Sequence, residues 1–300
     1  MSTAFEILYG LAIEIQVNPR FSSLTRHHDP ARDIVETRLQ QAICQLVMPD
    51  ERVESPWQKL RIFCLNYVNR AQAAVSEDEV RRLLAQVEQA HADDEDRFAA
   101  IAGMARTSLQ GRRATELVDA IAQLTSPEPV PALGHLSYMD WISQRWFYWV
   151  NRQVDQLDAD ELLADIAVLS DNKATKVKGM QLALAANLFA DLGLGAFAKP
   201  DLHVTPVINL LQLRHGEEAA FRGLVRIAQA ENQRLRRRQE FSWLAREGGL
   251  WPRFLDRLIY LIGSDNFALD GRKNKRHAPK RRELMRDALI EGGLVDARYK

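Results

Sequence analysis

Apolar residues recur every three to four positions along most of the chain, the spacing that places them on one face of an α-helix. No alternating run bounded by turn residues stands out, as half-buried strands would require. The pattern therefore predicts an all-α fold. Asp158 followed by Glu161 marks one helix start, because an Asp at the N-cap accepts backbone amides of the first turn. The helices are expected near residues 3–16, 31–47, 56–74, 77–90, 94–108, 112–124, 137–153, 158–169, 175–192, 206–214, 217–237, 251–262 and 280–291.

The strongest break in this pattern is the segment SPEPVP at residues 126–131. Its alternate prolines lack amide donors and favour an extended polyproline conformation. We interpret this segment as a linker between two helical regions. The predicted division is an N-terminal helical region at 1–125, a Pro-rich linker at 126–133, and a second helical region with a basic C-terminal segment at 134–300.

The composition fits a folded protein in a reducing compartment. Of the 300 residues, 46% are hydrophobic, which is enough to fill a core. The two cysteines, Cys44 and Cys64, cannot form a disulfide framework or a four-cysteine metal centre, which favours the cytoplasm. No stretch of about eighteen uncharged apolar residues is present, so we expect no membrane partner. Glu6 and Glu14 interrupt the first apolar segment, which is unlike a signal peptide.

The motifs of several common enzyme classes are absent, and we expect no cofactor and no metal. The sequence contains no Walker A phosphate loop, no H-E-x-x-H zinc helix and no G-x-S-x-G nucleophile elbow. Gly193-x-Gly195-x-x-Ala198 follows a predicted helix instead of the strand that a dinucleotide site needs. The seven histidines are scattered, and His27-His28 has no second group of ligands at metal-binding spacing.

Charge is divided unevenly along a chain whose formal net charge is zero. Residues 232–300 hold 17 basic and 9 acidic side chains, a net charge of +8, so the preceding residues carry −8. A basic cluster of this kind can neutralise DNA phosphates and release counterions. The alternative is a solvated helix face that the acidic half of the chain balances. The residues expected to contact DNA in this segment are Arg272, Lys273, Lys275 and Arg276.

Residues 171–211 carry the most specific pattern, reading DNKATKVKGMQLALAANLFADLGLGAFAKPDLHVTPVINLL. A polar turn is followed by an apolar helix, a glycine-containing break, the triplet Lys-Pro-Asp and the start of another helix. This segment resembles the helix-hairpin-helix DNA glycosylase superfamily, in which a lysine- and glycine-rich hairpin grips the DNA backbone. The resemblance implies two helical lobes with a DNA-binding cleft, and an essential aspartate at the mouth of the base pocket, which falls on Asp201. The DNA contacts that it implies are Lys173, Lys178, Gly179, Lys199 and His203.

The hairpin departs from the family pattern L-P-G-x-G-x-K-T-A, because the stretch LSDNKATK that ends at Lys176 lacks both glycines. In bifunctional members of the superfamily a lysine forms a Schiff base with the sugar. Alignment by the hairpin places this catalytic lysine on Lys176, whereas counting back from Asp201 places it near Leu184, and both placements stay open. Like-charge repulsion from Lys173 and Lys178 would help to activate Lys176.

Asp201 has two interpretations. In a glycosylase an ionised carboxylate stabilises the positive charge that develops on the deoxyribose as the base leaves, or it positions the attacking water. The plainer interpretation is a helix N-cap, the ordinary role of an Asp before an apolar helix. Thr205-Pro206 is itself a good cap and first helical residue, which would start the next helix there and leave Asp201 free in the preceding loop.

An aromatic helix, YMDWISQRWFYWV, offers a candidate base pocket. Trp141, Arg145 and Tyr148 fall on one face of this helix and could stack a base that has been extruded from the duplex. The alternative is that these side chains pack against neighbouring helices in the core.

These observations favour an enzyme that acts on a flipped-out DNA base, most simply by hydrolysing the N-glycosidic bond with Asp201 as the essential carboxylate. A second interpretation uses the same scaffold to transfer an amino acid or amine, as co-substrate, onto pyrophosphorylated 5-hydroxymethyl-uracil in DNA, as phage proteins that resemble this superfamily do. A third is a DNA-binding module without catalysis. DNA is the expected partner in all three, and the expected location is the cytoplasm.

Overall fold

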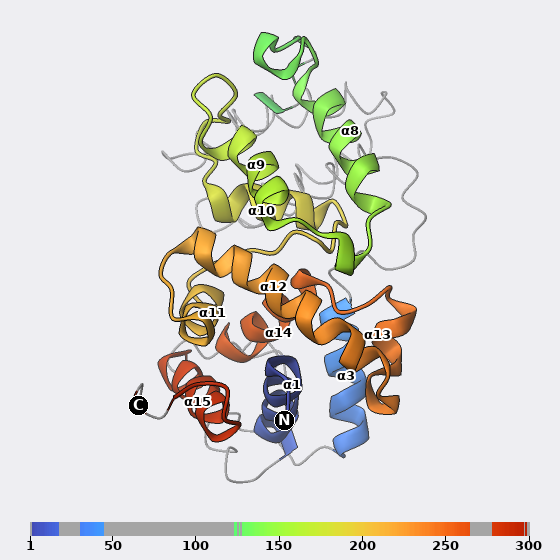
Figure 1. The fold of residues 1–300 in the computed structure, drawn as a ribbon, viewed down its shortest axis with the longest axis vertical. Helices are drawn as coiled ribbons and strands as arrows, with labels where there is room; N and C mark the ends of the chain where they lie inside the picture. The colour runs from blue at the N-terminus through green and yellow to red at the C-terminus, as the bar shows by residue number, and fades with distance from the viewer. Residues whose placement is uncertain are drawn as a thin grey trace, which may run out of the picture. The chain divides into compact units, whose positions relative to one another are not determined.

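The computed structural model describes residues 2–17, 31–44, 123–124, 126, 128–264, 278–296 and 298. Within these residues the regular structure is helical, with one isolated β-bridge between Val130 and Leu136 and no strand, which confirms the all-α expectation for this part of the chain (Figure 1). The α-helices are α1 (Ala4–Val17), α3 (Arg32–Cys44), α8 (Tyr138–Val150), α9 (Ala159–Ser170), α10 (Leu182–Asp191), α11 (Val204–Gln212), α12 (Glu217–Arg236), α13 (Ser242–Arg246), α14 (Pro252–Ser264) and α15 (Ala278–Glu291).

The chain divides into two compact units. The described residues of the first unit are 2–17, 31–44, 152–163, 195–264, 278–296 and 298, and those of the second are 123–124, 126, 128–151 and 164–194. The first unit therefore combines segments from both sides of the predicted linker at 126–133. The linker, and the cleft between two lobes, stay predictions. Within 126–133, Pro131–Leu133 forms a 3₁₀ turn (η3) that ends at Gly134 with φ 69°, so this part is not extended as expected.

Helix α14 holds the first unit together. Its apolar residues surround most of the helix, and Phe254, Leu255, Leu258 and Ile259 have no exposed surface. It packs against α1, α3, α11, α12 and α15. Burial of each of these side chains stabilises the fold by about 1.5–3 kcal/mol. The loop that carries Asp201 is anchored on this buried helix by hydrogen bonds.

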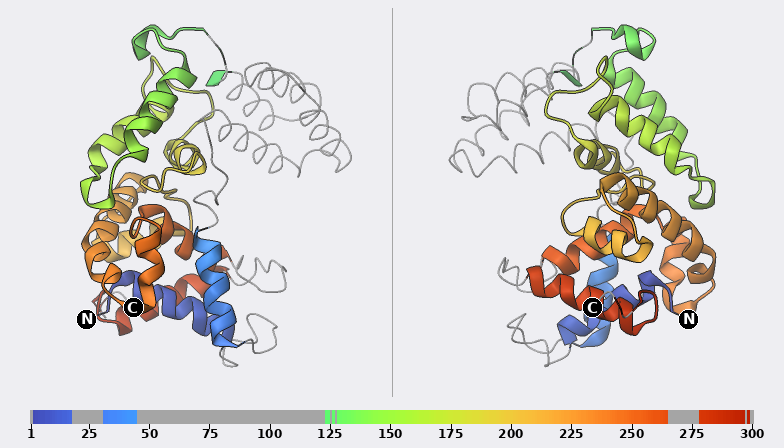
Figure 2. Two further views of the ribbon diagram at one scale, coloured as in Figure 1. Left: turned by 90° about the vertical axis from the view of Figure 1, so that its right-hand side faces the viewer. Right: turned by 60° about the vertical axis from the view of Figure 1, so that its left-hand side comes forward.

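The N-terminal helix α1 is part of the same core. In Figures 1 and 2 it lies beside α15, drawn in dark blue and red, and the two helices are in contact. Glu231 of α12 accepts hydrogen bonds from the amides of Ala4 (2.7 Å) and Phe5 (3.0 Å) at the start of α1. The Phe5 ring packs against Phe241 and Trp243, with centroids 5.8 and 6.2 Å away. The first and the last helices of the described chain therefore depend on each other.

Two helix starts differ from those that the pattern predicts, and one short helix is not predicted. Helix α10 begins at Leu182 instead of 175, because the preceding residues form a hairpin in which Gly179 has φ 76°. Helix α11 begins at Val204, two residues early, for a reason given below. Helix α13, together with the 3₁₀ turn η5 (Gln239–Phe241), has no counterpart among the predicted helices. The predicted helices at 56–74, 77–90 and 94–108, and all but the end of 112–124, lie outside the described residues.

Candidate functional site

Asp201 lies in the loop between α10 and α11 and caps the start of α11. Its Oδ1 accepts hydrogen bonds from the amides of His203 (2.9 Å) and Val204 (3.2 Å), and its carbonyl oxygen accepts one from the Thr205 amide (2.9 Å). The expectation that the helix starts at Thr205-Pro206 and leaves Asp201 free is wrong, because Asp201 satisfies the first amides itself. Pro206 instead lies in the first helical turn, where a missing N–H costs no hydrogen bond.

Only one of the two Asp201 carboxylate oxygens takes part in this cap. No residue that the structure describes donates a hydrogen bond to Oδ2, and the side chain is half-buried. The exposed amides at a helix N-terminus stabilise a nearby negative charge, and two hydrogen bonds to one oxygen fix the orientation of the carboxylate. The turn thus presents a fixed carboxylate with one oxygen available to a ligand.

A buried ion pair on α14 anchors the loop that carries Asp201. Asp256 Oδ2 accepts a hydrogen bond from the amide of Lys199 (2.8 Å) and one from Arg253 Nη1 (2.9 Å), while the Arg253 amide donates to the Gly195 carbonyl (3.1 Å). Both charged side chains are buried. Burial raises the pKa of Asp256, and Arg253 and the Lys199 amide oppose that shift. The loop is therefore fixed at both Gly195 and Lys199.

His203 packs edge-on against Tyr260 of α14, with ring centroids 5.7 Å apart. Its Nδ1 is buried and has no hydrogen-bond partner among the described residues, and a Cβ at Gly263 would lie 3.0 Å from this atom. Burial lowers the pKa of His203; Asp201 opposes this shift, and cations such as Arg282 add to it. A histidine whose pKa is lowered is mostly neutral at pH 7, so it can offer a ligand a hydrogen bond but not a positive charge.

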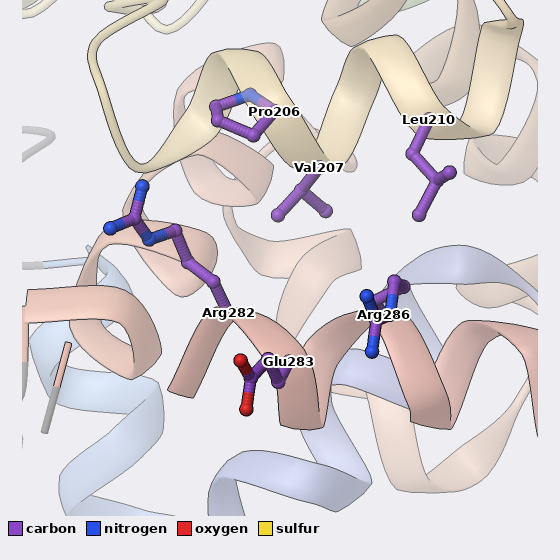
Figure 3. Close-up of a pocket in the computed structure, with 6 residues that line it drawn as sticks. All are labelled: Pro206, Val207, Leu210, Arg282, Glu283 and Arg286. Atoms are coloured by element: carbon purple, nitrogen blue, oxygen red, sulfur yellow. The ribbon is translucent and has the colours of Figure 1, made fainter. Parts of the chain in front are cut away.

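Helix α15 brings two arginines to the same side of α11. A cavity of about 390 Å³ lies between these helices, and Arg282 and Arg286 line it from α15. In Figure 3, Arg282 extends toward the loop that leads into α11. Neither arginine is among the predicted site residues. The one sequence signal is their i, i+4 spacing on the predicted helix at 280–291, but nothing in the sequence pairs that helix with α11.

The predicted DNA-gripping hairpin lies in the second unit, between α9 and α10. The side chains of Lys173, Lys176 and Lys178 are exposed, whereas those of Thr175 and Val177 between them are buried. The hairpin therefore presents three ammonium groups to solvent. Schiff-base lysines are activated by desolvation in an apolar pocket, and the exposed side chain of Lys176 has no such surroundings. A catalytic role for Lys176 stays a prediction.

Hydrogen bonds fix the hairpin backbone. The Val177 amide donates to the Leu169 carbonyl (2.9 Å), and the Tyr138 hydroxyl donates to the Thr175 carbonyl (2.6 Å). The Lys178 amide donates a hydrogen bond to Gln123 Oε1 (3.1 Å), so this amide is not available to a ligand. Gly179, with its φ of 76°, is the exposed glycine of the hairpin and supplies a left-handed turn without the glycine pair of the family pattern.

The candidate base-pocket residues on α8 are in contact with neighbouring residues of the second unit. Arg145 Nε forms an ion pair with Asp165 Oδ2 (2.7 Å), and the Arg145 guanidinium stacks on Tyr148 at 4.5 Å from the ring centroid. Trp141 meets Phe189 of α10 edge-on at 6.2 Å between centroids. These contacts are those of a packed helix interface, which is the alternative interpretation of this face. The base-pocket assignment itself stays a prediction.

Arg272, Lys273, Lys275 and Arg276 lie outside the described residues. In the part of the chain that is described, no group of three or more His, Cys, Asp or Glu is placed to hold a metal, and no helix has the length and apolarity to cross a membrane. Comparison with protein families, with curated proteins and with solved structures found no match.

Proposed function

We propose that this chain binds DNA and acts on a base flipped out of the duplex, cleaving the N-glycosidic bond with Asp201 as the essential carboxylate. The observation that carries the proposal is the hydrogen bonding of the Asp201 carboxylate. Oδ1 is fixed by two amides at the start of α11, and no described residue donates a hydrogen bond to Oδ2. A preorganised negative charge of this kind stabilises positive charge on a reacting sugar without the cost of reorienting the catalytic group.

Each part of the reaction has a residue that can support it. As the bond between C1′ and the base breaks, the base leaves with the electron pair and the deoxyribose becomes positively charged. Asp201 stabilises this charge, and a water molecule adds to C1′ and releases its proton to Asp201 Oδ2 or to solvent. His203, neutral and adjacent, can orient the water or the base by a hydrogen bond.

Positive charge in both units supports DNA as the substrate. Lys199 precedes Asp201 in the anchored loop, and Arg282 faces the same turn from α15. The hairpin presents Lys173, Lys176 and Lys178 to solvent. Contacts of lysine and arginine with phosphates position a nucleic acid irrespective of its sequence. The proposal requires hydrolysis of the glycosidic bond and no lyase step. In this proposal Lys176 therefore serves as a DNA contact and not as a nucleophile.

The test is the substitution Asp201→Asn, because Asn is as good an N-cap as Asp but carries no charge. The matched control is Asp158→Asn. Asp158 caps α9 in the same manner, as its sequence predicts, with Oδ1 accepting from the amides of Asp160 (2.8 Å) and Glu161 (3.4 Å). We expect both variants to fold and to bind DNA, and only Asp201→Asn to lose base release.

The assay incubates wild type and variants with duplexes bearing damaged bases or 5-hydroxymethyl-uracil, with and without pyrophosphorylated bases and amino acids, and resolves the nucleosides by mass. Free base and an abasic strand, both abolished by Asp201→Asn, support the proposal. A heavier nucleoside in intact DNA would indicate transfer of an amino acid or amine instead. If no substrate gives a product, the interpretation as a DNA-binding module without catalysis is favoured. If strand nicking occurs and persists in Lys176→Ala, Lys176 is not the lyase nucleophile.

A further inference from the structure

We propose that the cavity between α11 and α15 binds a phosphodiester group of the DNA backbone, held by Arg282 and Arg286. This inference rests on the proposed function and adds the contact that places the DNA strand next to Asp201. The cavity has a volume of about 390 Å³, which is within the range of small-ligand sites. Its lining residues are Pro206, Val207 and Leu210 of α11 and Arg282, Glu283 and Arg286 of α15.

Both arginines line the cavity from the same face of α15. They lie one helical turn apart on α15, so their Cβ atoms are neighbours at about 5–6 Å. Figure 3 shows the Arg282 side chain extending toward the loop before α11, while Arg286 and the carboxylate of Glu283 stay beside α15. Guanidinium groups match the geometry of phosphate oxygens and form charge-assisted hydrogen bonds with them. Arg282 can donate to a free oxygen of a phosphodiester, and Arg286 adds positive charge to the same cavity.

Neither guanidinium is strongly engaged elsewhere. No described residue forms a hydrogen bond or an ion pair with Arg282, although it is half-buried in the cavity wall. Among the described residues, Arg286 pairs only with its neighbour Asp287, at 3.3 Å, and the two side chains are 39% and 45% exposed. An exposed pair of this kind contributes little to stability, so a phosphate can displace it at small cost. The cavity therefore offers two cations to an incoming anion.

The charge and the surface of the cavity select the type of anion. Two arginines and Glu283 give the lining a formal charge of +1. A phosphodiester carries one negative charge, whereas a terminal phosphate carries about 1.5 to 2 at pH 7. The apolar wall formed by Val207 and Leu210 suits the carbon face of a deoxyribose. A zwitterionic amino acid fits less well, because its ammonium group would lie among cations.

The cavity is also linked to the Asp201 turn. The amides at the start of α11 are taken by Asp201, so the arginine side chains and not the helix N-terminus must hold the anion. Arg282 is close enough to His203 to affect its titration. Because Arg282 extends toward the loop before α11, a backbone phosphate held there would bring the adjoining nucleoside to the side of the unit that carries Asp201.

The first experiment measures the salt dependence of binding to a fluorescent duplex by anisotropy. We expect the double variant Arg282→Ala/Arg286→Ala to bind DNA about tenfold more weakly than the wild type, because a hydrogen bond to a charged group is lost. The loss of affinity should be similar for all DNA sequences. The slope of log K against log salt should decrease by about 0.9, the value for one phosphate. The matched control, Arg226→Ala/Arg236→Ala, removes two exposed arginines of α12 in the same unit. The assignment of this phosphate site would be overturned if the double variant kept the wild-type slope, or if the control variant showed an equal decrease in slope.

A variant expected to gain affinity tests the site even if the double arginine variant fails to fold. Glu283→Gln removes the one negative charge of the lining from an exposed position. We expect it to bind DNA about threefold more tightly with no loss of thermal stability, because an opposing surface charge is removed. Unchanged or weaker binding would contradict the proposal.

Small probes distinguish the backbone from other sources of an anion. The dinucleotide dTpdT, which contains a phosphodiester, should raise the melting temperature of the wild type but not of the double arginine variant. A larger shift with dTMP or with free glutamate, also lost in the variant, would overturn the phosphodiester assignment. Failure of the proposed function can be distinguished from failure of the phosphate site. If the proposed function is wrong, no base is released, whereas the phosphate site is tested by DNA binding alone.

Discussion

The buried ion pair beneath the Asp201 loop gives the sharpest stability prediction. Asp256→Leu removes the acceptor for both the Lys199 amide and the Arg253 guanidinium. It leaves a buried cation and a backbone donor without this acceptor, in the part of the first unit that positions Asp201. The arginine is only 6% exposed, so water cannot readily replace the lost carboxylate.

The expected cost follows from burial. Removing one partner of a buried ion pair destabilises proteins by about 3–5 kcal/mol. The lost hydrogen bond to Lys199 is part of the same network, so it does not add in full, and we expect a total of about 4 kcal/mol. Replacing both partners, as Arg253→Met/Asp256→Leu, removes the unpaired charge and should recover at least about 2 kcal/mol of that loss.

Urea unfolding followed by circular dichroism measures these free energies of unfolding. The control is Asp287→Asn, which removes an exposed carboxylate from its pair with Arg286 and should change the free energy by less than about 0.5 kcal/mol. Hydrogen exchange at the Lys199 amide gives a local readout, since its protection should fall in Asp256→Leu. A cost below about 1 kcal/mol with Lys199 protection intact would refute the assignment of Asp256 as the anchor of the loop.

Three further predictions concern His203 and Gly195, on either side of this loop, and Gly10 of α1. The pKa of folded His203 lies below the value of about 6.5 in the unfolded chain, so protons bind preferentially to the unfolded form as the pH falls. The free energy of unfolding should therefore decrease from pH 7.5 to 5.5, and His203→Gln should make that decrease smaller in urea titrations. Gly195→Ala should destabilise by about 1–3 kcal/mol, because its Cβ would lie 2.8 Å from Trp251 Cγ. In contrast, Gly10→Ala in α1 meets open space and should stabilise by about 0.5–1 kcal/mol; equal melting temperatures for the two variants would contradict this reasoning.

The sequence predicts much of the helical architecture because helix formation leaves a local signal. The period of apolar residues locates α12 and α14 within a few residues, and the capping signal at Asp158 identifies the start of α9. Helix α13 has too few residues to display a period, so burial of Trp243 rather than any pattern accounts for it. The start of α11 depends on a choice between two caps, Asp201 and Thr205, that both look competent in sequence.

The candidate site was only partly accessible to the same reasoning, because its contacts join distant segments. The spacing around Asp201 indicates a functional or capping carboxylate, but the anchor at Asp256 requires that α14 pack beneath the loop. Likewise Arg282 belongs to a basic segment whose charge is visible, whereas its position against α11 is set by tertiary packing. Sequence periodicity defines which face of a helix is buried, but not which helix covers it.

The cap that Glu231 places on the first helix has a consequence for how the protein is made. The carboxylate that accepts the Ala4 amide lies 227 residues farther along the chain, and α15, which packs on α1, is the last helix described. At about 5–20 residues per second, a ribosome needs roughly 15–60 s to make such a chain. During that time α3 can pack on α1, but the partners of α1 on α14 and α15 have not yet been made. We therefore expect the nascent first unit to expose part of the apolar face of α1 to chaperones until α14 and α15 have been made.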